Sequence, residues 1–263
     1  MNAPAGWAER IRSGDRRAIA RAITAVENAT AQGRELLVQL ACSAGQARVI
    51  GVTGPPGAGK STLVNALVKE LIARGHSVAV IAVDPSSPIT GGAVLGDRIR
   101  MAEVQADARV FIRSLAARGH LGGLTSNAKD VVAVLDAAGF GTVIVETVGT
   151  GQSEVEIAGI AATKVVVCPP GLGDDVQALK AGVLEIADVF VVNKADLPDA
   201  GRTERELFSM LALRRAGRRP PVLKTVATSG EGVAALADEV MRHAAVAAHQ
   251  SVPIFRPPVR PGS

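Results

Sequence analysis

Seven short apolar runs recur along this chain, and polar or glycine-rich residues follow most of them. Their alternation with segments of helical spacing predicts an α/β fold with a doubly wound, mainly parallel sheet of about seven strands. Right-handed crossovers bring the carboxyl ends of parallel strands to one edge, so we expect ligand-binding residues in the loops after the strands. The predicted strands are Val49–Thr53, Val78–Val83, Arg109–Ile112, Thr142–Glu146, Lys164–Cys168, Val189–Asn193 and Val222–Val226.

The first 45 residues have helical spacing instead. Apolar side chains recur every three or four positions from Gly6 to Ala41, and Gly33 is expected to separate two helices. Residues 1–45 are therefore predicted to form an N-terminal helical hairpin and residues 46–249 the core domain. Residues 250–263 are rich in proline and are expected to form a disordered or loosely docked tail.

The loop after the first predicted strand matches the phosphate-binding pattern G-x-x-x-x-G-K-[ST] at every fixed position. Its glycines let successive backbone N–H groups turn toward a phosphate, and the following helix presents its positive end. Lys60 would place a charge at the β- and γ-phosphates, and Ser61 would ligate Mg²⁺. The core domain is therefore predicted to be a P-loop NTPase. The residues expected at the nucleotide are Gly54, Pro55, Pro56, Gly57, Ala58, Gly59, Lys60, Ser61 and Thr62.

The sequence Asn193-Lys194-Ala195-Asp196, at the end of the sixth predicted strand, indicates which base is bound. The carboxylate of Asp196 can accept both the N1–H and the exocyclic amino group of guanine, a pair of donors that adenine lacks, while the Lys194 stem covers the base. These residues therefore favour GTP over ATP. A second base contact is expected from the loop at Val226 and Ala227, where the Ala227 N–H could meet the guanine carbonyl.

Two carboxylates, Asp84 and Asp97, flank a glycine-rich segment after the second predicted strand. Either could complete the Mg²⁺ shell or order the attacking water, and Asp97 is the better metal candidate because its loop can close onto the site. The alternative is that one aspartate lies in a turn and the other caps a helix.

The fourth predicted strand ends at Glu146, and Gly149 follows three positions later with an N–H that could sense the γ-phosphate. In most GTPases the acid is an aspartate and a glutamine directly follows the glycine. Here Thr150 takes that place and Gln152 lies two residues later. We therefore expect slow GTP hydrolysis by the isolated protein, with a partner or a rearranged loop completing the site.

A glycine-hinged acidic loop begins at Gly171 and enters a predicted helix. Its carboxylates, Asp174 and Asp175, are candidates for a further switch element, and a simple helix N-cap explains either one equally well.

Composition agrees with one nucleotide-binding core. The chain has 263 residues, 48% of them hydrophobic, a net charge of +4 and two cysteines far apart in sequence. Without a C-x-x-C motif, an eighteen-residue apolar stretch or a secretory leader in the sequence, we expect a reduced, cytoplasmic protein that uses no membrane. The arginine-rich run 214–219 is interpreted as a solvated helix end or a site for an anionic partner. It has no interleaved aromatic residues, which disfavours nucleic acid.

Five runs of sequence resemble the G-protein chaperones of adenosylcobalamin-dependent acyl-CoA mutases, the methylmalonyl-CoA mutase-associated (MeaB/ArgK) type. The resemblance implies a homodimeric GTPase that docks on a B12-dependent mutase, gates cofactor delivery from an adenosyltransferase and helps expel damaged cobalamin. It covers roughly residues 13–240. The runs are GDRRAIARAIT, GVTGPPGAGKSTLVNAL, VDPSSPITGGAVLGDRIRM, ETVGTGQSEVEIA and GDDVQALKAGVLEIADVFVVNKADLP.

The resemblance also implies roles by position. Asp174 and Lys180 fall in the part that this family uses as a third switch, which couples the nucleotide state to the mutase. Glu146 corresponds to the switch II acid, and with Ser61 and Asp97 it is an expected ligand of Mg²⁺. Lys60, Ser61 and Asp97 correspond to phosphate and Mg²⁺ contacts, and Asn193, Lys194 and Asp196 to the residues that read the base.

Members of this family usually continue past the last core helix with a long dimerisation arm, whereas only the Pro-rich tail follows that helix here. Without that arm the sequence does not decide whether the protein forms a homodimer. The client could be a 2-hydroxyisobutyryl-CoA or isobutyryl-CoA mutase instead of methylmalonyl-CoA mutase.

Two other functions are also open. A nickel-insertion GTPase of hydrogenase or urease maturation would need soft or imidazole ligands, and the histidines of this chain are scattered. An ATPase for amino-acid uptake would need adenine recognition, which Asp196 opposes.

Overall fold

The computed structural model of the protein describes residues 6–85, 102–117, 123–147, 157–171, 185–212 and 219–248. Its centre is a seven-stranded sheet in the order β3-β2-β4-β1-β5-β6-β7, and every pairing in it is parallel. The predicted sheet is confirmed. The strands are β1 (Arg48–Thr53), β2 (Val78–Pro85), β3 (Val110–Ala117), β4 (Thr142–Glu146), β5 (Thr163–Cys168), β6 (Val189–Asn193) and β7 (Val222–Thr225).

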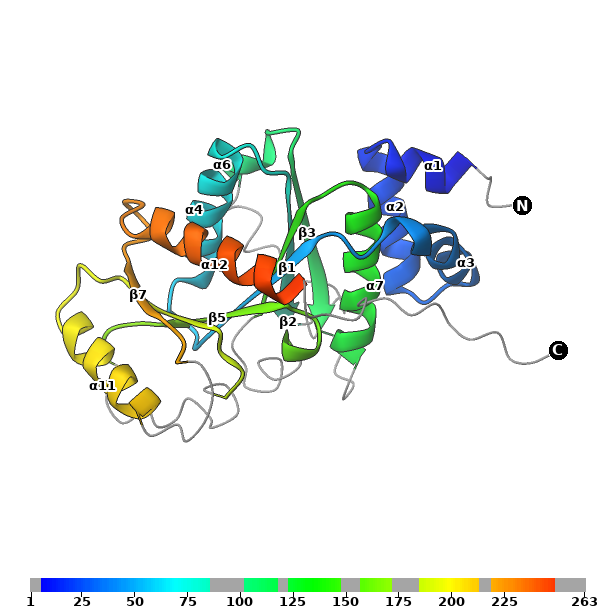
Figure 1. Ribbon diagram of the computed structural model, residues 1–263. Coiled ribbons are helices and arrows are strands. Elements are labelled where there is room, and N and C mark those ends of the chain that lie inside the picture. The colour runs from blue at the N-terminus through cyan, green and yellow to red at the C-terminus, as the bar shows by residue number, and fades with distance from the viewer. Residues whose placement is uncertain are drawn as a thin grey trace.

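Helices cover the two faces of this sheet (Figure 1). They are α1 (Gly6–Arg12), α2 (Arg16–Glu27), α3 (Ala31–Leu40), α4 (Lys60–Ala73), α6 (Ala102–Gln105), α7 (Gly123–Ala137), α11 (Ala200–Ala212) and α12 (Val233–Ala248), with short 3-10 turns η1 (Ala41–Ser43) and η2 (Ile157–Gly159).

Successive residues of a strand point to opposite faces, and in β1, β4, β5 and β6 they are buried on both faces. On β1, Val49 packs into a core shared with α1, α2, α3 and α7, whereas Ile50 and Val52 pack into a core with α4 and α12. A third cluster joins α11 to β5 and β6 around Phe190. Burial on both faces explains why the strands read as continuous apolar runs in the sequence.

The N-terminal segment differs from the prediction in where it breaks. It forms three helices, and Gly33 lies inside α3. The chain turns instead before Asp15, which caps α2 by accepting from the backbone N–H of Ala18, and before Thr30, which caps α3 by accepting from the N–H of Gly33. A Cβ at Gly33 would lie 2.6 Å from the carbonyl oxygen of Ala25, so this glycine allows α3 to approach α2 closely.

Asp136, on α7, fixes the loop that leads from the N-terminal helices into β1. Its carboxylate accepts from the backbone N–H groups of Gly45, Gln46 (3.0 Å) and Ala47 (2.9 Å). Burial raises the pKa of this carboxyl group, and the three N–H bonds oppose that shift. The helical segment and the sheet therefore meet through a polar contact as well as a shared apolar core.

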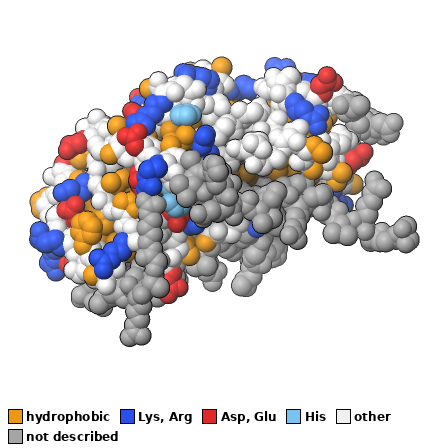
Figure 2. Space-filling view, viewed as in Figure 1, with side chains coloured by type: hydrophobic (Ala, Val, Ile, Leu, Met, Phe, Trp, Pro, Cys, Tyr) orange, Lys and Arg blue, Asp and Glu red, His pale blue; other side chains and the backbone are white. Residues whose placement is uncertain are grey.

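Acidic and basic side chains are interspersed on the face shown in Figure 2. On and beside α11, Arg202 pairs with Glu206 and Lys224 pairs with Glu204, so acidic and basic side chains there form ion pairs. Most of the arginine-rich run 214–219 lies outside the described residues. No described helix has the length and apolar character needed to cross a membrane.

Candidate nucleotide-binding site

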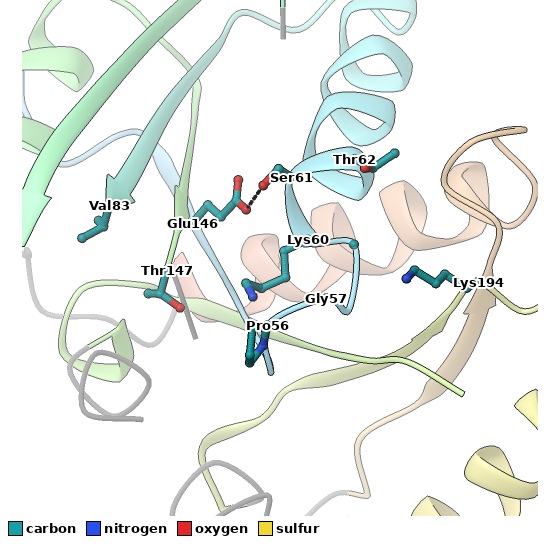
Figure 3. Close-up of a pocket in the computed structure, with 10 residues that line it drawn as sticks. Pro56, Gly57, Lys60, Ser61, Thr62, Val83, Glu146, Thr147 and Lys194 are labelled. Carbon is teal, nitrogen blue, oxygen red and sulfur yellow. Dashed lines mark hydrogen bonds between the residues drawn. The ribbon is translucent and has the colours of Figure 1, made fainter. Parts of the chain in front are cut away.

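The predicted site residues meet at the carboxyl edge of the sheet, after β1, β4, β6 and β7. Two adjoining cavities lie there, of about 500 Å³ and about 290 Å³, and Gly59, Thr62 and Lys194 line both. The larger cavity is bounded by the loop after β1 and by the end of β4 (Figure 3). The smaller one is bounded by the loops after β6 and β7. This division matches a nucleotide with its phosphates in one half and its base in the other.

The phosphate loop needs glycine at its two ends for different reasons. Gly54 has a φ of 143°, and a Cβ there would overlap the carbonyl oxygen of Val167 on β5. Gly59 has a φ of 84°, and a Cβ there would lie 2.5 Å from Asn193 Nδ2. Both residues are in backbone conformations that L side chains rarely adopt. The loop therefore packs against β5 and β6 through bare backbone, at the start of α4.

Lys60 is 7% exposed and lines the larger cavity. Its Nζ donates to the carbonyl oxygens of Gly54, at 2.9 Å, and Pro55, at 3.0 Å. These bonds hold the ammonium group inside the loop, on the side where Figure 3 shows Pro56 and Gly57. A cation in this place can bind phosphate oxygens.

Ser61 and Glu146 are in direct contact across the larger cavity. The Ser61 hydroxyl donates to Glu146 Oε1 at 2.6 Å, and both side chains are buried (Figure 3). A hydroxyl and a carboxylate are hard oxygen donors, which suit Mg²⁺ better than a softer metal. The pair therefore fits the metal role that the sequence predicts for these two residues.

Asn193 connects the three loops of the site. Its Nδ2 donates to the carbonyl oxygen of Ala58 at 2.9 Å, and its Oδ1 accepts from the hydroxyl of Thr225 at 3.0 Å and from the N–H of Ala227 at 3.2 Å. The side chain is 1% exposed. This residue therefore holds the phosphate loop and the loop after β7 at a fixed separation.

The smaller cavity contains the residues predicted to read the base. Lys194, Asp196, Val226 and Ala227 all line it. Lys194 has a φ of 57°, which turns the chain sharply after β6. The Ala227 N–H already donates to Asn193, so a contact with guanine would require this hydrogen to be shared.

Seven of the predicted site residues cannot be placed in full. Asp84 lies in β2, but its side chain is outside the described part of the structure. The others, which lie wholly outside the described residues, are Asp97, Gly149, Gln152, Asp174, Asp175 and Lys180.

The structure adds lining residues that the sequence reasoning did not assign. Val83 and Thr147 line the phosphate half, and Leu197 and Thr228 line the base half. Leu197 is 47% exposed, which is unusual for a large apolar residue in this structure. Each of the four lies at or just after the carboxyl end of a strand, and that position was the available signal.

A family model described as methylmalonyl-CoA mutase-associated GTPase MeaB matches residues 19–252. The chain belongs to the MeaB family. A protein of Pyrococcus abyssi named as a GTPase is 53% identical over 240 residues, which cover 89% of this chain and 74% of that protein. The mouse methylmalonic aciduria type A homolog, mitochondrial, is 37% identical over 245 residues, 86% of this chain and 59% of that protein.

Solved structures agree with this fold. The crystal structure of a LAO/AO transport system kinase superposes with a TM-score of 0.76 at 31% identity, covering 97% of this chain and 80% of that one. HypB from Helicobacter pylori in complex with nickel gives a TM-score of 0.58 at 16% identity, covering 81% and 93%, and shares the fold.

Family membership and fold together establish the activity class. The MeaB-family chain is a P-loop GTPase that binds guanine nucleotide and hydrolyses GTP.

Within the described residues, no group of three or more His, Cys, Asp or Glu side chains is arranged to hold a metal ion.

Proposed function

We propose that this GTPase is a chaperone of a B12-dependent acyl-CoA mutase, either methylmalonyl-CoA mutase or a relative such as 2-hydroxyisobutyryl-CoA or isobutyryl-CoA mutase. In this role it gates the loading of adenosylcobalamin and protects or reactivates the mutase. The observation that carries the proposal is the match to the mutase-associated GTPase family over residues 19–252. The name of the mouse relative, which refers to methylmalonic aciduria, supports the same client chemistry.

In the proposed reaction, the phosphates of GTP occupy the larger cavity and the base occupies the smaller one. Lys60 binds the β- and γ-phosphates, and Asp196 accepts the two guanine donors. Ser61 and Glu146 would hold Mg²⁺, which neutralises charge on the phosphates during transfer. Asp84, Asp97 and Gly149 are proposed to complete the γ-phosphate side of the site.

The contact between Ser61 and Glu146 suggests how nucleotide state reaches the partner. Any ligand that engages the Ser61 hydroxyl changes the environment of Glu146, which ends β4 and leads toward Gln152. Asp174, Asp175 and Lys180 are the proposed partner-facing switch. For the nucleotide to control docking, the mutase must bind one nucleotide state more tightly than the other.

The remaining features of the proposal are the compartment, the partners and the rate of hydrolysis. We place the protein in the cytoplasm, with an adenosyltransferase as a further partner and slow hydrolysis that the mutase accelerates. A homodimer is compatible with this function. Nickel insertion has less support, because the resemblance to HypB is one of fold at 16% identity.

The test is GTP turnover by the purified protein, alone and with each purified candidate mutase. We expect a slow basal rate and a large increase with one mutase. Lys60→Ala should abolish turnover in both conditions. Lys69→Ala is the matched control, because Lys69 is also on α4 but pairs with Glu103 at the exposed surface. A rate that no mutase changes, or near-normal turnover by Lys60→Ala, would contradict the proposal.

A further inference from the structure

Two buried threonine hydroxyls meet where the phosphate loop and the end of β4 leave the sheet. Thr147 Oγ1 donates to Thr53 Oγ1 at 2.9 Å. Thr53 is fully buried and is the last residue of β1, directly before Gly54, and Thr147, 1% exposed, directly follows Glu146. Figure 3 shows Thr147 next to Glu146 at the edge of the larger cavity.

The backbone strengthens this junction. The Thr147 N–H donates to the carbonyl oxygen of Val52 at 3.1 Å, which extends the pairing of β4 with β1 by one residue beyond Glu146. The hydroxyl pair extends the contact further, to the residue before the phosphate loop. The end of β4 is thus attached to β1 by one main-chain and one side-chain bond.

The other end of the connection from β4 to β5 is also held on β1. Ile157, in η2, is fully buried, and its side chain takes the space where a Cβ of Gly51 would be, at 2.7 Å. The Ala162 N–H donates to the carbonyl oxygen of Val49 at 3.0 Å. The strand that carries the phosphate loop therefore fixes both ends of this connection.

We propose that the Thr53–Thr147 hydroxyl pair is a positioning element for GTP hydrolysis. By fixing the chain immediately after Glu146 to the strand immediately before Gly54, it sets the position of the Glu146 carboxylate relative to Ser61. The inference rests on the proposed metal role of Glu146 and adds two residues that act through it. Thr147 lies at the edge of the larger cavity, and in the proposed role both threonines act through the position of Glu146.

A buried hydroxyl pair is a precise way to hold this junction. A hydrogen bond has a preferred length and direction, whereas apolar contacts between two valines of the same shape tolerate a small slip. Replacing one threonine by valine keeps the volume and β-propensity but removes the bond. The expected loss in rate is about 2- to 12-fold, the range that corresponds to one net hydrogen bond.

The experiment compares Thr147→Val, Thr53→Val and Thr147→Ser with the wild type. Both valine variants should lower kcat by a similar factor, with the KM for GTP changed by less than about twofold, and the double variant should be no slower than either. Thr147→Ser should keep the wild-type rate, because serine retains the hydroxyl group. The matched control is Thr163→Val, because Thr163 is a fully buried threonine at the amino end of β5, away from the carboxyl edge that holds the site, and is bonded to His243 at 3.0 Å.

A second measurement does not depend on turnover. The affinity of the protein for a fluorescent GDP is measured with Mg²⁺ and with a chelator. In chelator, Thr147→Val should bind GDP with the wild-type affinity. It should lose part of the increase in GDP affinity that Mg²⁺ produces (the Mg²⁺ gain), whereas Thr163→Val should show the full increase.

The outcomes separate this inference from the proposed function. If Glu146→Gln abolishes the Mg²⁺ gain but Thr147→Val and Thr53→Val behave as wild type, the positioning inference is wrong and the metal role stands. If Thr163→Val lowers kcat as much as Thr147→Val, the effect is general destabilisation and the inference is wrong. If Glu146→Gln retains both turnover and the Mg²⁺ gain, the proposed metal role itself fails.

Discussion

Replacing Asn193 by alanine should weaken the protein and its nucleotide site together. Asn193 makes three short bonds, one to the phosphate loop through the Ala58 carbonyl and two to the end of β7 through the Thr225 hydroxyl and the Ala227 N–H. Its Nδ2 also lies 3.5 Å from the Gly59 carbonyl oxygen, a long and weak contact. Alanine removes all three short bonds. The two loops then lose the side chain that spans the gap between them.

The magnitude follows from the number of bonds and from their access to water. Each bond contributes about 1 kcal/mol net, so the three together contribute about 3 kcal/mol. Asn193 also lines the smaller cavity, from which water can reach some of the groups left behind. We therefore expect the free energy of unfolding to fall by about 2–3 kcal/mol.

The assay combines urea unfolding with nucleotide binding. Because Asn193 holds the phosphate loop, its loss should weaken GTP and ATP binding alike, by about 10- to 100-fold for a change of about 1.4–2.8 kcal/mol. Asp196→Asn is the contrasting variant, since Asp196 lines the base cavity. It should keep the stability of the wild type and lower the affinity for GTP while leaving that for ATP nearly unchanged.

Two results would refute this reasoning. An Asn193→Ala protein that loses less than about 0.5 kcal/mol of stability, the lower limit for one such bond, would show that the hydrogen bonds at Asn193 contribute little. A loss of affinity confined to GTP would show that Asn193 acts on the base and leaves the phosphate loop in place. An unchanged GTP-to-ATP preference in Asp196→Asn would count against its base-reading role.

Three further predictions concern the scaffold. Gly33→Ala should destabilise the protein by about 1–3 kcal/mol, because the added methyl group would press on the Ala25 carbonyl; calorimetry on this variant should give a lower melting temperature. Asp136→Ala should cost about 1–2 kcal/mol, measured by urea unfolding, since three backbone N–H groups lose their acceptor at a partly solvated loop. At pH 8 one thiol, that of the exposed Cys42, should react rapidly with a disulfide reagent, and the second only on unfolding, because burial raises the pKa of Cys168 to about 12.

The sequence by itself determined the sheet and most of the nucleotide chemistry. Parallel strands buried on both faces must be apolar along their whole length, so β4 (Thr142–Glu146) and β6 (Val189–Asn193) were predicted with the bounds that the structure has. The phosphate loop was equally visible, because close packing of backbone against phosphate allows few residues other than glycine, lysine and serine at fixed spacing. Local rules of this kind need no knowledge of distant residues.

The N-terminal segment shows where local rules mislead. A glycine in a helical pattern usually marks a break, which is why Gly33 was expected to end a helix. Its actual role depends on the approach of α2, which the spacing of α3 does not reveal. The true turns use Asp15 and Thr30 as caps, two residue types that are common at the start of helices.

Only the tertiary structure decided which polar residues at the site contact one another. Ser61 and Glu146 are separated by 85 positions, and they are bonded because β4 lies next to β1 in the sheet. Asn193 and Ala58 are separated by 135 positions, and they are bonded because β6 lies on the other side of β1, one strand beyond β5. The same arrangement brings Thr147 onto Thr53, two residues with no motif to mark them. Strand order is set by packing of the whole chain. A motif can therefore predict the chemistry of a residue, but it does not determine which distant residue that side chain contacts.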